Sequence, residues 1–86
     1  MLVLSTFLGI LIKMFHDDHN PPHFHVEYGE YRAVLEIGSG KLLAGRLPKR
    51  VQQLVKEWRR RHRNELRRAW VDAQAGRQPR RIRPLE

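Results

Sequence analysis

The sequence predicts an α+β fold in which a three- to four-stranded antiparallel sheet is followed by one long C-terminal helix. Two patterns carry this prediction. Residues 23–37 alternate apolar and polar side chains with a period of two, which is typical of strands with one buried face. Residues 48–76 repeat apolar side chains every three or four positions, which is typical of an amphipathic helix.

The 86 residues provide material for one domain, which we place at residues 1–86. We assign the sheet to residues 6–45, the helix to residues 48–76 and an extended basic tail to residues 77–86. The apolar stretch Thr6–Phe15 is the expected first strand. Residues 1–12 lack the basic start and cleavage site of a signal peptide and are shorter than the ~20 residues of a membrane helix. We therefore expect no membrane association.

The alternating stretch predicts a hairpin whose two-residue turn is Gly29-Glu30. The paired residues of this register, first on the apolar face and then on the polar face, are Tyr28–Tyr31, Val26–Ala33, Phe24–Leu35, Glu27–Arg32, His25–Val34 and His23–Glu36. A slip of one residue would mix the two faces, so the apolar pattern favours this register. Residues 41–44 are expected to add a short fourth strand.

The predicted helix begins at Pro48, where the missing N–H costs little, and ends at Gly76. Because this stretch is long for a globular helix, we expect a kink near residues 62–64. Trp58 and Trp70 fall on the apolar stripe, so we assign both to the core rather than to stacking on nucleic-acid bases.

Positive charge is concentrated in the C-terminal half of the chain, whose formal net charge is +8. Residues 45–86 contain fourteen Lys or Arg and four carboxylates. Residues 1–44 contain three Lys or Arg and five carboxylates. A surface of this kind attracts nucleic acid, RNA before DNA, or an acidic protein partner. The candidate nucleic-acid contacts are Arg32, Arg59, Arg60, Arg63 and Arg67. The alternative is an ordinary solvated helix face, followed by a tail that is either mobile or docked through Ile82 and Leu85.

Four of the five histidines lie in the polar run His16–His25. His23 and His25 are two residues apart on a strand, so their rings project from the same face, with Glu36 opposite His23. One use is a divalent metal site, such as a zinc site, formed by His19, His23 and His25. Another is acid–base cleavage of a phosphodiester, with His23, His25 and Glu36 as catalytic groups and Arg32 holding phosphate. A solvated polar sheet face is the third interpretation.

The stretch Phe15–Tyr28, with its Asn-Pro-Pro-His-Phe-His core, resembles the signature of the short bacterial domain-of-unknown-function family 4160. Its signature maps onto His19, Pro21, Pro22, His23, His25 and Glu27. Later residues are also similar to the helix of that family: Leu47-Pro48-Lys49-Arg50, Trp58, His62, Glu65-Leu66 and Trp70. The resemblance implies an arrangement like a toxin–antitoxin pair, because members are often encoded beside a second small family, number 2442.

Two classes of function are therefore expected. The first is a nucleic-acid-directed component of a toxin–antitoxin-like module, with RNase activity at the histidine-rich face. The second is a non-enzymatic module that binds a small partner protein or a metal ion, or that associates with itself. The absence of cysteine excludes disulfides and thiolate metal sites, and it fits a cytoplasmic location. The sequence leaves open whether the protein is an enzyme.

Overall fold

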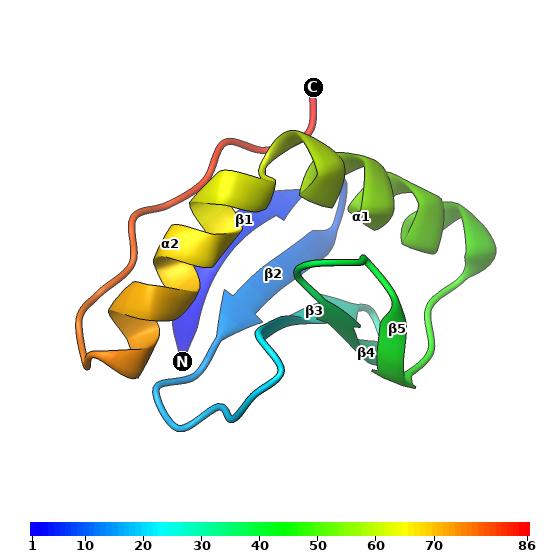
Figure 1. The fold of residues 1–86 in the computed structure, drawn as a ribbon. Helices are drawn as coiled ribbons and strands as arrows, with labels where there is room; N and C mark the ends of the chain where they lie inside the picture. The colour runs from blue at the N-terminus through cyan, green and yellow to red at the C-terminus, as the bar shows by residue number, and fades with distance from the viewer.

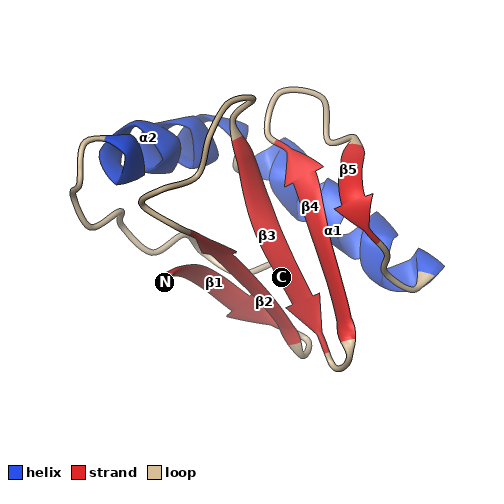
Figure 2. Cartoon of the chain, turned by 90° about the horizontal axis from the view of Figure 1, so that it is seen from below, coloured by secondary structure: helices blue, strands red, loops and turns tan.

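Five antiparallel strands form a single sheet in the computed structural model, which describes residues 1–86, and two helices cover one face of that sheet (Figure 1). The strands, which neighbour one another in chain order, are β1 (Leu2–Phe7), β2 (Ile10–Met14), β3 (His23–Tyr28), β4 (Tyr31–Glu36) and β5 (Leu42–Gly45). The helices are α1 (Lys49–Arg61) and α2 (Arg63–Gln74). Figure 2 shows the molecule from below, with α1 passing behind β4 and β5 and α2 lying beyond the end of β3. The α+β class is confirmed.

The sheet has more strands than predicted because the N-terminal stretch is a hairpin, and the single strand expected at residues 6–15 is wrong. The chain turns at Leu8-Gly9, where both residues have positive φ, 52° and 79°. This geometry suits the tight turn between antiparallel strands, and Gly9 adopts it without a steric penalty. Apolar residues occupy most positions of both strands and the first turn position, so the period-two signal of each strand was hidden in the sequence.

The predicted register of β3 and β4 is confirmed at every pair, from His23 opposite Glu36 to Tyr28 opposite Tyr31. The side chains of Phe24 and Leu35 are fully buried beneath the helices, whereas His23 and Glu36 are only half-buried. The expected short fourth strand is β5, which pairs with β4.

The single long helix is interrupted at His62, within the region where a kink was predicted. His62 has φ −122°, outside the helical range, and its N–H donates to the carbonyl oxygens of Trp58 and Arg59 at 3.0 and 3.1 Å. The interruption redirects α2, so that Trp58 and Trp70 both reach the sheet from differently oriented helices (Figure 1). Gly76, with φ 77°, follows the end of α2 as predicted. Neither helix has the length and apolar composition that crossing a membrane requires.

The C-terminal segment, residues 77–86, runs back along the molecule and is docked rather than mobile (Figure 1). The N–H of Ile82 donates to the carbonyl of Leu4 in β1 at 2.7 Å, and the Ile82 side chain is buried. The indole N–H of Trp58 donates to the carbonyl of Arg83 at 2.8 Å. Leu85 packs half-buried against the core, so the expected docking of Ile82 and Leu85 is confirmed. The segment also shields the exposed edge of β1.

Phe24 provides a test of the assigned faces. We expect Phe24→Ala to lower the free energy of unfolding by about 3–5 kcal/mol, because a fully buried aromatic ring leaves a cavity. Val71→Ala, on the solvent side of α2 with 57% exposure, should change it by less than about 0.5 kcal/mol. Urea denaturation of both variants measures the difference, and equal effects would contradict the face assignment.

Candidate functional site

A carboxylate and two imidazoles meet where the β2–β3 loop packs against the start of β3. His23 and His25 project from the outer face of β3, and Asp18 reaches them from the loop. Oδ1 of Asp18 lies 3.1 Å from Nε2 of His25 and 3.4 Å from Nε2 of His23. We call Asp18, His23 and His25 the Asp-His-His cluster.

The loop is held in place by the C-terminal part of α2. The side chain of Gln74 donates from Nε2 to the carbonyl of Asp18 at 2.7 Å, and Nδ1 of His16 lies 3.1 Å from the carbonyl of Ala73. Within the loop, the N–H of Phe15 donates to Oδ2 of Asp18 at 3.0 Å. The Asn20–Pro21 peptide bond is cis. These contacts fix Asp18 against β3 although the loop has no regular structure.

Aromatic rings surround the cluster and limit the rotation of both histidines. The ring of His23 lies 5.2 Å from the ring of Trp70 and 5.1 Å from the ring of His25, while Phe15 packs edge-on to His25 at 4.8 Å. The side chains of Asp18, His23 and His25 retain 10, 13 and 23% of their exposure. The cluster is therefore preorganised and still reachable from solvent.

Asp18 is ionised at neutral pH. Burial raises the pKa of Asp18, but the hydrogen bond from the Phe15 N–H and the proximity of His25 and His23 outweigh it and leave the pKa below its ordinary value. The cluster thus contains one fixed negative charge between two titratable rings.

The hydrogen bonding of His23 directs a lone pair toward that charge. Nδ1 of His23 lies 2.8 Å from the carbonyl oxygen of Pro21, which accepts only, so Nδ1 carries a proton. In the neutral ring Nε2 is then an acceptor, and it faces the acceptor Oδ1 of Asp18. This lone pair and the carboxylate oxygen point toward the same space, where both could donate to a metal ion.

The two separations from Asp18 suit a metal site. One ligand atom from each residue lies within 4.8 Å of the others. In a tetrahedral site with metal–ligand bonds of about 2.0–2.1 Å, neighbouring ligand atoms are roughly 3.3 Å apart. The two separations from Asp18, 3.1 and 3.4 Å, bracket that value, and the ligand atoms of His23 and His25 lie within 4.8 Å of each other.

The remaining predicted site residues lie outside the cluster. Glu36 is opposite His23 in the register, but its carboxylate accepts a hydrogen bond from Ser39 in the following turn. His19 is exposed at the loop tip and does not belong to the group of convergent ligands. Asp18 was missed because only the folded loop brings it to His23 and His25 of β3, five and seven residues beyond it in the chain. Its position in a polar run before Pro21-Pro22 was the only signal.

The predicted nucleic-acid arginines divide into two groups. Arg59 is buried, and it donates from Nε to the carbonyl of Ile37 at 2.7 Å and from Nη2 to the carbonyl of Gly38. Burial, and then the nearby Arg63 and Arg67, lower the pKa of Arg59. Arg59 therefore serves the fold, by holding the turn after β4, rather than presenting its charge to a ligand.

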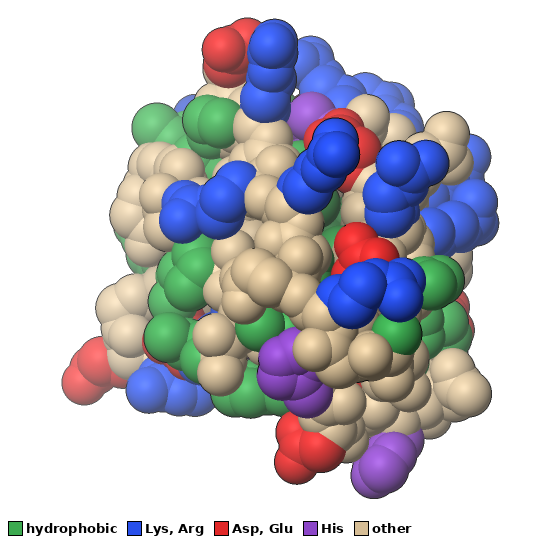
Figure 3. Space-filling model, turned by 90° about the vertical axis from the view of Figure 1, so that its left-hand side faces the viewer, with side chains coloured by type: hydrophobic (Ala, Val, Ile, Leu, Met, Phe, Trp, Pro, Cys, Tyr) green, Lys and Arg blue, Asp and Glu red, His purple; other side chains and the backbone are tan.

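The other candidates are on the surface. Arg60 is paired with Glu57, and Nε of Arg32 lies 4.0 Å from Glu27. Arg63 and Arg67 are exposed and have no carboxylate within 4 Å. Figure 3, which looks at the side where α2 and the C-terminal segment lie, shows Lys and Arg side chains across much of that face.

A family model described as "Domain of unknown function (DUF4160)" matches residues 9–71. The match contains the Asp-His-His cluster and most of α2, and it ends before the C-terminal segment. No curated protein and no solved structure matches the chain.

The depressed pKa of Asp18 makes a prediction about acid stability. Its ionised carboxylate should stabilise the fold above the ordinary pKa of 3.8, and that contribution should disappear as the pH falls through the lower folded value. We expect Asp18→Asn to flatten the loss of stability between about pH 5 and pH 2, measured by urea denaturation in the presence of a chelator. Asp17→Asn is the matched control, because Asp17 is exposed and unpaired, and it should retain the wild-type slope.

Proposed function

This chain belongs to the DUF4160 family, and we propose that it is a small metal-dependent nuclease, acting on RNA before DNA, in the cytoplasm as part of a toxin–antitoxin-like module. The observation that carries the proposal is the convergence of three ligand atoms, from Asp18, His23 and His25, with the lone pair of His23 directed at the carboxylate. Two imidazoles and a carboxylate form a ligand set typical of catalytic zinc sites.

The composition of the cluster supports hydrolysis as the proposed reaction. Three protein ligands leave a coordination position for water, and a divalent ion held there would provide a Lewis acid and an activated water. Hydrolysis forms one bond from the water oxygen to phosphorus and breaks one ester P–O bond. One water proton passes to the departing oxygen, and the other stays on the new phosphate. The carbonyl of Pro21 orients the ring of His23 through Nδ1, and the N–H of Phe15 orients the carboxylate of Asp18 through Oδ2.

The charge of the whole chain and the shape of the surface near the cluster support a nucleic-acid substrate. The 17 Lys and Arg outnumber the 9 carboxylates, so the protein attracts polyanions. A hollow of about 500 Å³ lies between α2 and the loop after β4, lined by Arg67, Trp70 and Pro22 among others. Trp70 packs against His23, so a phosphate held by Arg67 would lie on the side of the cluster.

A second candidate is a non-enzymatic module that binds a small partner protein. It is favoured by a hollow of about 380 Å³ on the outer face of the sheet, where Phe15, Val34 and Ala44 lie beside His25 and no helix covers them. Tight formation of a hetero-complex without hydrolysis of RNA would support this candidate over the nuclease.

Metal binding is the direct test of the cluster. We expect the purified protein to bind one Zn²⁺ in isothermal titration calorimetry, and Asp18→Asn, His23→Gln and His25→Gln each to weaken binding by more than roughly tenfold. His19→Gln removes an exposed histidine from the same loop and should bind like the wild type. Equal losses in His19→Gln and His25→Gln would contradict the assigned ligand set.

Cleavage is tested separately. We expect the zinc-loaded protein to hydrolyse single-stranded RNA, with activity removed by a chelator and restored by metal. Asp18→Asn and His25→Gln should be inactive although they remain folded at the assay temperature, and Glu36→Gln should remain active because Glu36 is turned toward Ser39. Expression of the chain should arrest growth, with rescue by the product of the neighbouring gene. Metal binding without cleavage or growth arrest would reject the nuclease and leave the metal centre intact.

A further inference from the structure

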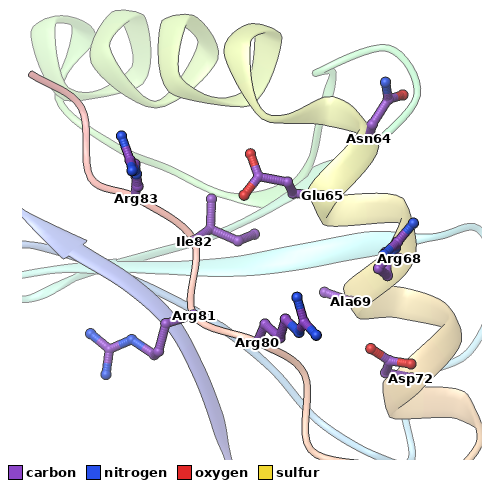
Figure 4. A pocket seen from close by; sticks show the side chains of 9 residues that line it. All are labelled: Asn64, Glu65, Arg68, Ala69, Asp72, Arg80, Arg81, Ile82 and Arg83. Atoms are coloured by element: carbon purple, nitrogen blue, oxygen red, sulfur yellow. The ribbon is translucent and has the colours of Figure 1, made fainter.

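A groove lies on the side of α2 away from the Asp-His-His cluster loop, between α2 and the docked C-terminal segment (Figure 4). It has a volume of about 360 Å³ and is lined by Asn64, Glu65, Arg68, Ala69, Asp72, Arg80, Arg81, Ile82 and Arg83. We call it the arginine groove. In Figure 4, Arg80 extends from the C-terminal segment toward α2, which contributes Arg68 to the opposite wall.

The charges of the arginine groove are not balanced within the protein. Of its two carboxylates, Asp72 pairs with Arg77 at 2.9 Å, and Glu65 lies in hydrogen-bond contact with Nδ1 of His62 at 2.6 Å. The guanidinium groups of Arg68, Arg80, Arg81 and Arg83 make no ion pair within the chain. Four unpaired cations therefore border one small concave surface, with Arg80 extending toward α2 and Arg81 pointing away from it (Figure 4).

The C-terminal wall of the groove is anchored at the backbone. Ile82 is buried and its N–H is bonded to Leu4, while the carbonyl of Arg83 accepts the Trp58 indole N–H. Pro79 is buried as well. The backbone carrying Arg80, Arg81 and Arg83 is thus held by the core, so binding a ligand costs less conformational entropy than it would on a mobile tail.

We propose that the arginine groove binds the phosphate backbone of a nucleic-acid strand. One guanidinium group can donate two parallel hydrogen bonds to two oxygens of a phosphate. The protein side of nucleic-acid interfaces is polar and strongly positive. An acidic protein surface fits less well, because protein interfaces need an apolar centre and only Ala69 and Ile82 of the nine lining residues are apolar. This inference rests on the proposed function only because both assume a nucleic acid as the ligand. Binding of a strand in the groove needs no metal ion.

The groove is formed by two parts of the chain, and only one of them lies mostly inside the stretch matched by the family model. Arg68 lies inside the stretch matched by the family model, whereas Arg80, Arg81 and Arg83 lie beyond its last residue, 71. The groove therefore needs the C-terminal segment as well as the stretch matched by the family model. It is separate from the Asp-His-His cluster, which lies entirely within that stretch.

The experiment compares two double variants that lose the same charge. Arg68→Gln with Arg80→Gln removes one cation from each wall, and Lys49→Gln with Arg50→Gln removes two exposed cations from the first turn of α1. The full chain is titrated against fluorescent single-stranded RNA, DNA of the same sequence and poly-glutamate over a range of salt. Thermal unfolding of each variant confirms that these surface changes leave the fold intact.

We expect the groove variant to bind RNA and DNA roughly tenfold more weakly at low salt and to flatten the log–log salt slope by about 1.4, since each lost strand contact removes about 0.7. The α1 variant should stay within about twofold of the wild type. Equal losses in both variants, or no loss in the groove variant, would overturn the proposal, as would tighter binding of poly-glutamate than of either nucleic acid. If the groove variant loses more affinity for one of the two nucleic acids, that nucleic acid is the one the groove prefers. The titrations are made with a chelator present, so failure of the metal centre does not affect them and is distinguishable from failure of the groove.

Discussion

Burial of the Trp58 side chain is the interaction on which the arrangement of the other elements depends. Its ring packs 5.7 Å from Phe7 in β1 and 6.0 Å from Phe24 in β3, so one residue of α1 ties together strands that are two positions apart in the sheet. Its carbonyl accepts the N–H of His62 at the helix break. Its indole N–H holds the C-terminal segment at Arg83. A buried indole needs such a partner, because an unsatisfied N–H in the core is costly.

The helix break that follows Trp58 also determines where the candidate chemistry lies. Because α2 is redirected at His62, its last turns reach the β2–β3 loop, and Trp70 and Gln74 contact His23 and Asp18. The outer-face histidines therefore gain a carboxylate partner and an aromatic wall. The Asp-His-His cluster is built by the end of a helix against a loop, and the sheet alone supplies only two of its three members.

The basic residues serve two different purposes. Arg59 is buried and donates hydrogen bonds to the carbonyls of Ile37 and Gly38, which stabilises the turn between β4 and β5. Arg68 and the arginines of the C-terminal segment instead keep their charge at the surface, where the docked backbone positions them. The same residue type thus acts as a structural crosslink at one position and as an unpaired surface cation at others. The difference is set by burial, which a count of charges does not reveal.

The amino-acid sequence by itself determined the properties that follow from periodicity. The period of two fixes which side chains of β3 and β4 face the helices, and the match of apolar residues across Gly29-Glu30 determines the register. The length of the apolar helical stripe indicated an interruption near His62. The N-terminal hairpin escaped detection because Leu8, an apolar residue, occupies its turn with φ 52°. Local patterns of this kind involve neighbours in the chain, so a sequence displays them directly.

Only the tertiary structure decided which residues from separate segments meet. Asp18, rather than His19 or Glu36, joins His23 and His25, because the loop folds back and is held by Gln74 from α2, 56 residues away. Arg59 is buried and Arg80 faces Arg68 for the same kind of reason: the break at His62 and the docking of Ile82 set the paths of both segments. Such contacts depend on packing between distant parts of the chain, and no repeating pattern in the sequence encodes them.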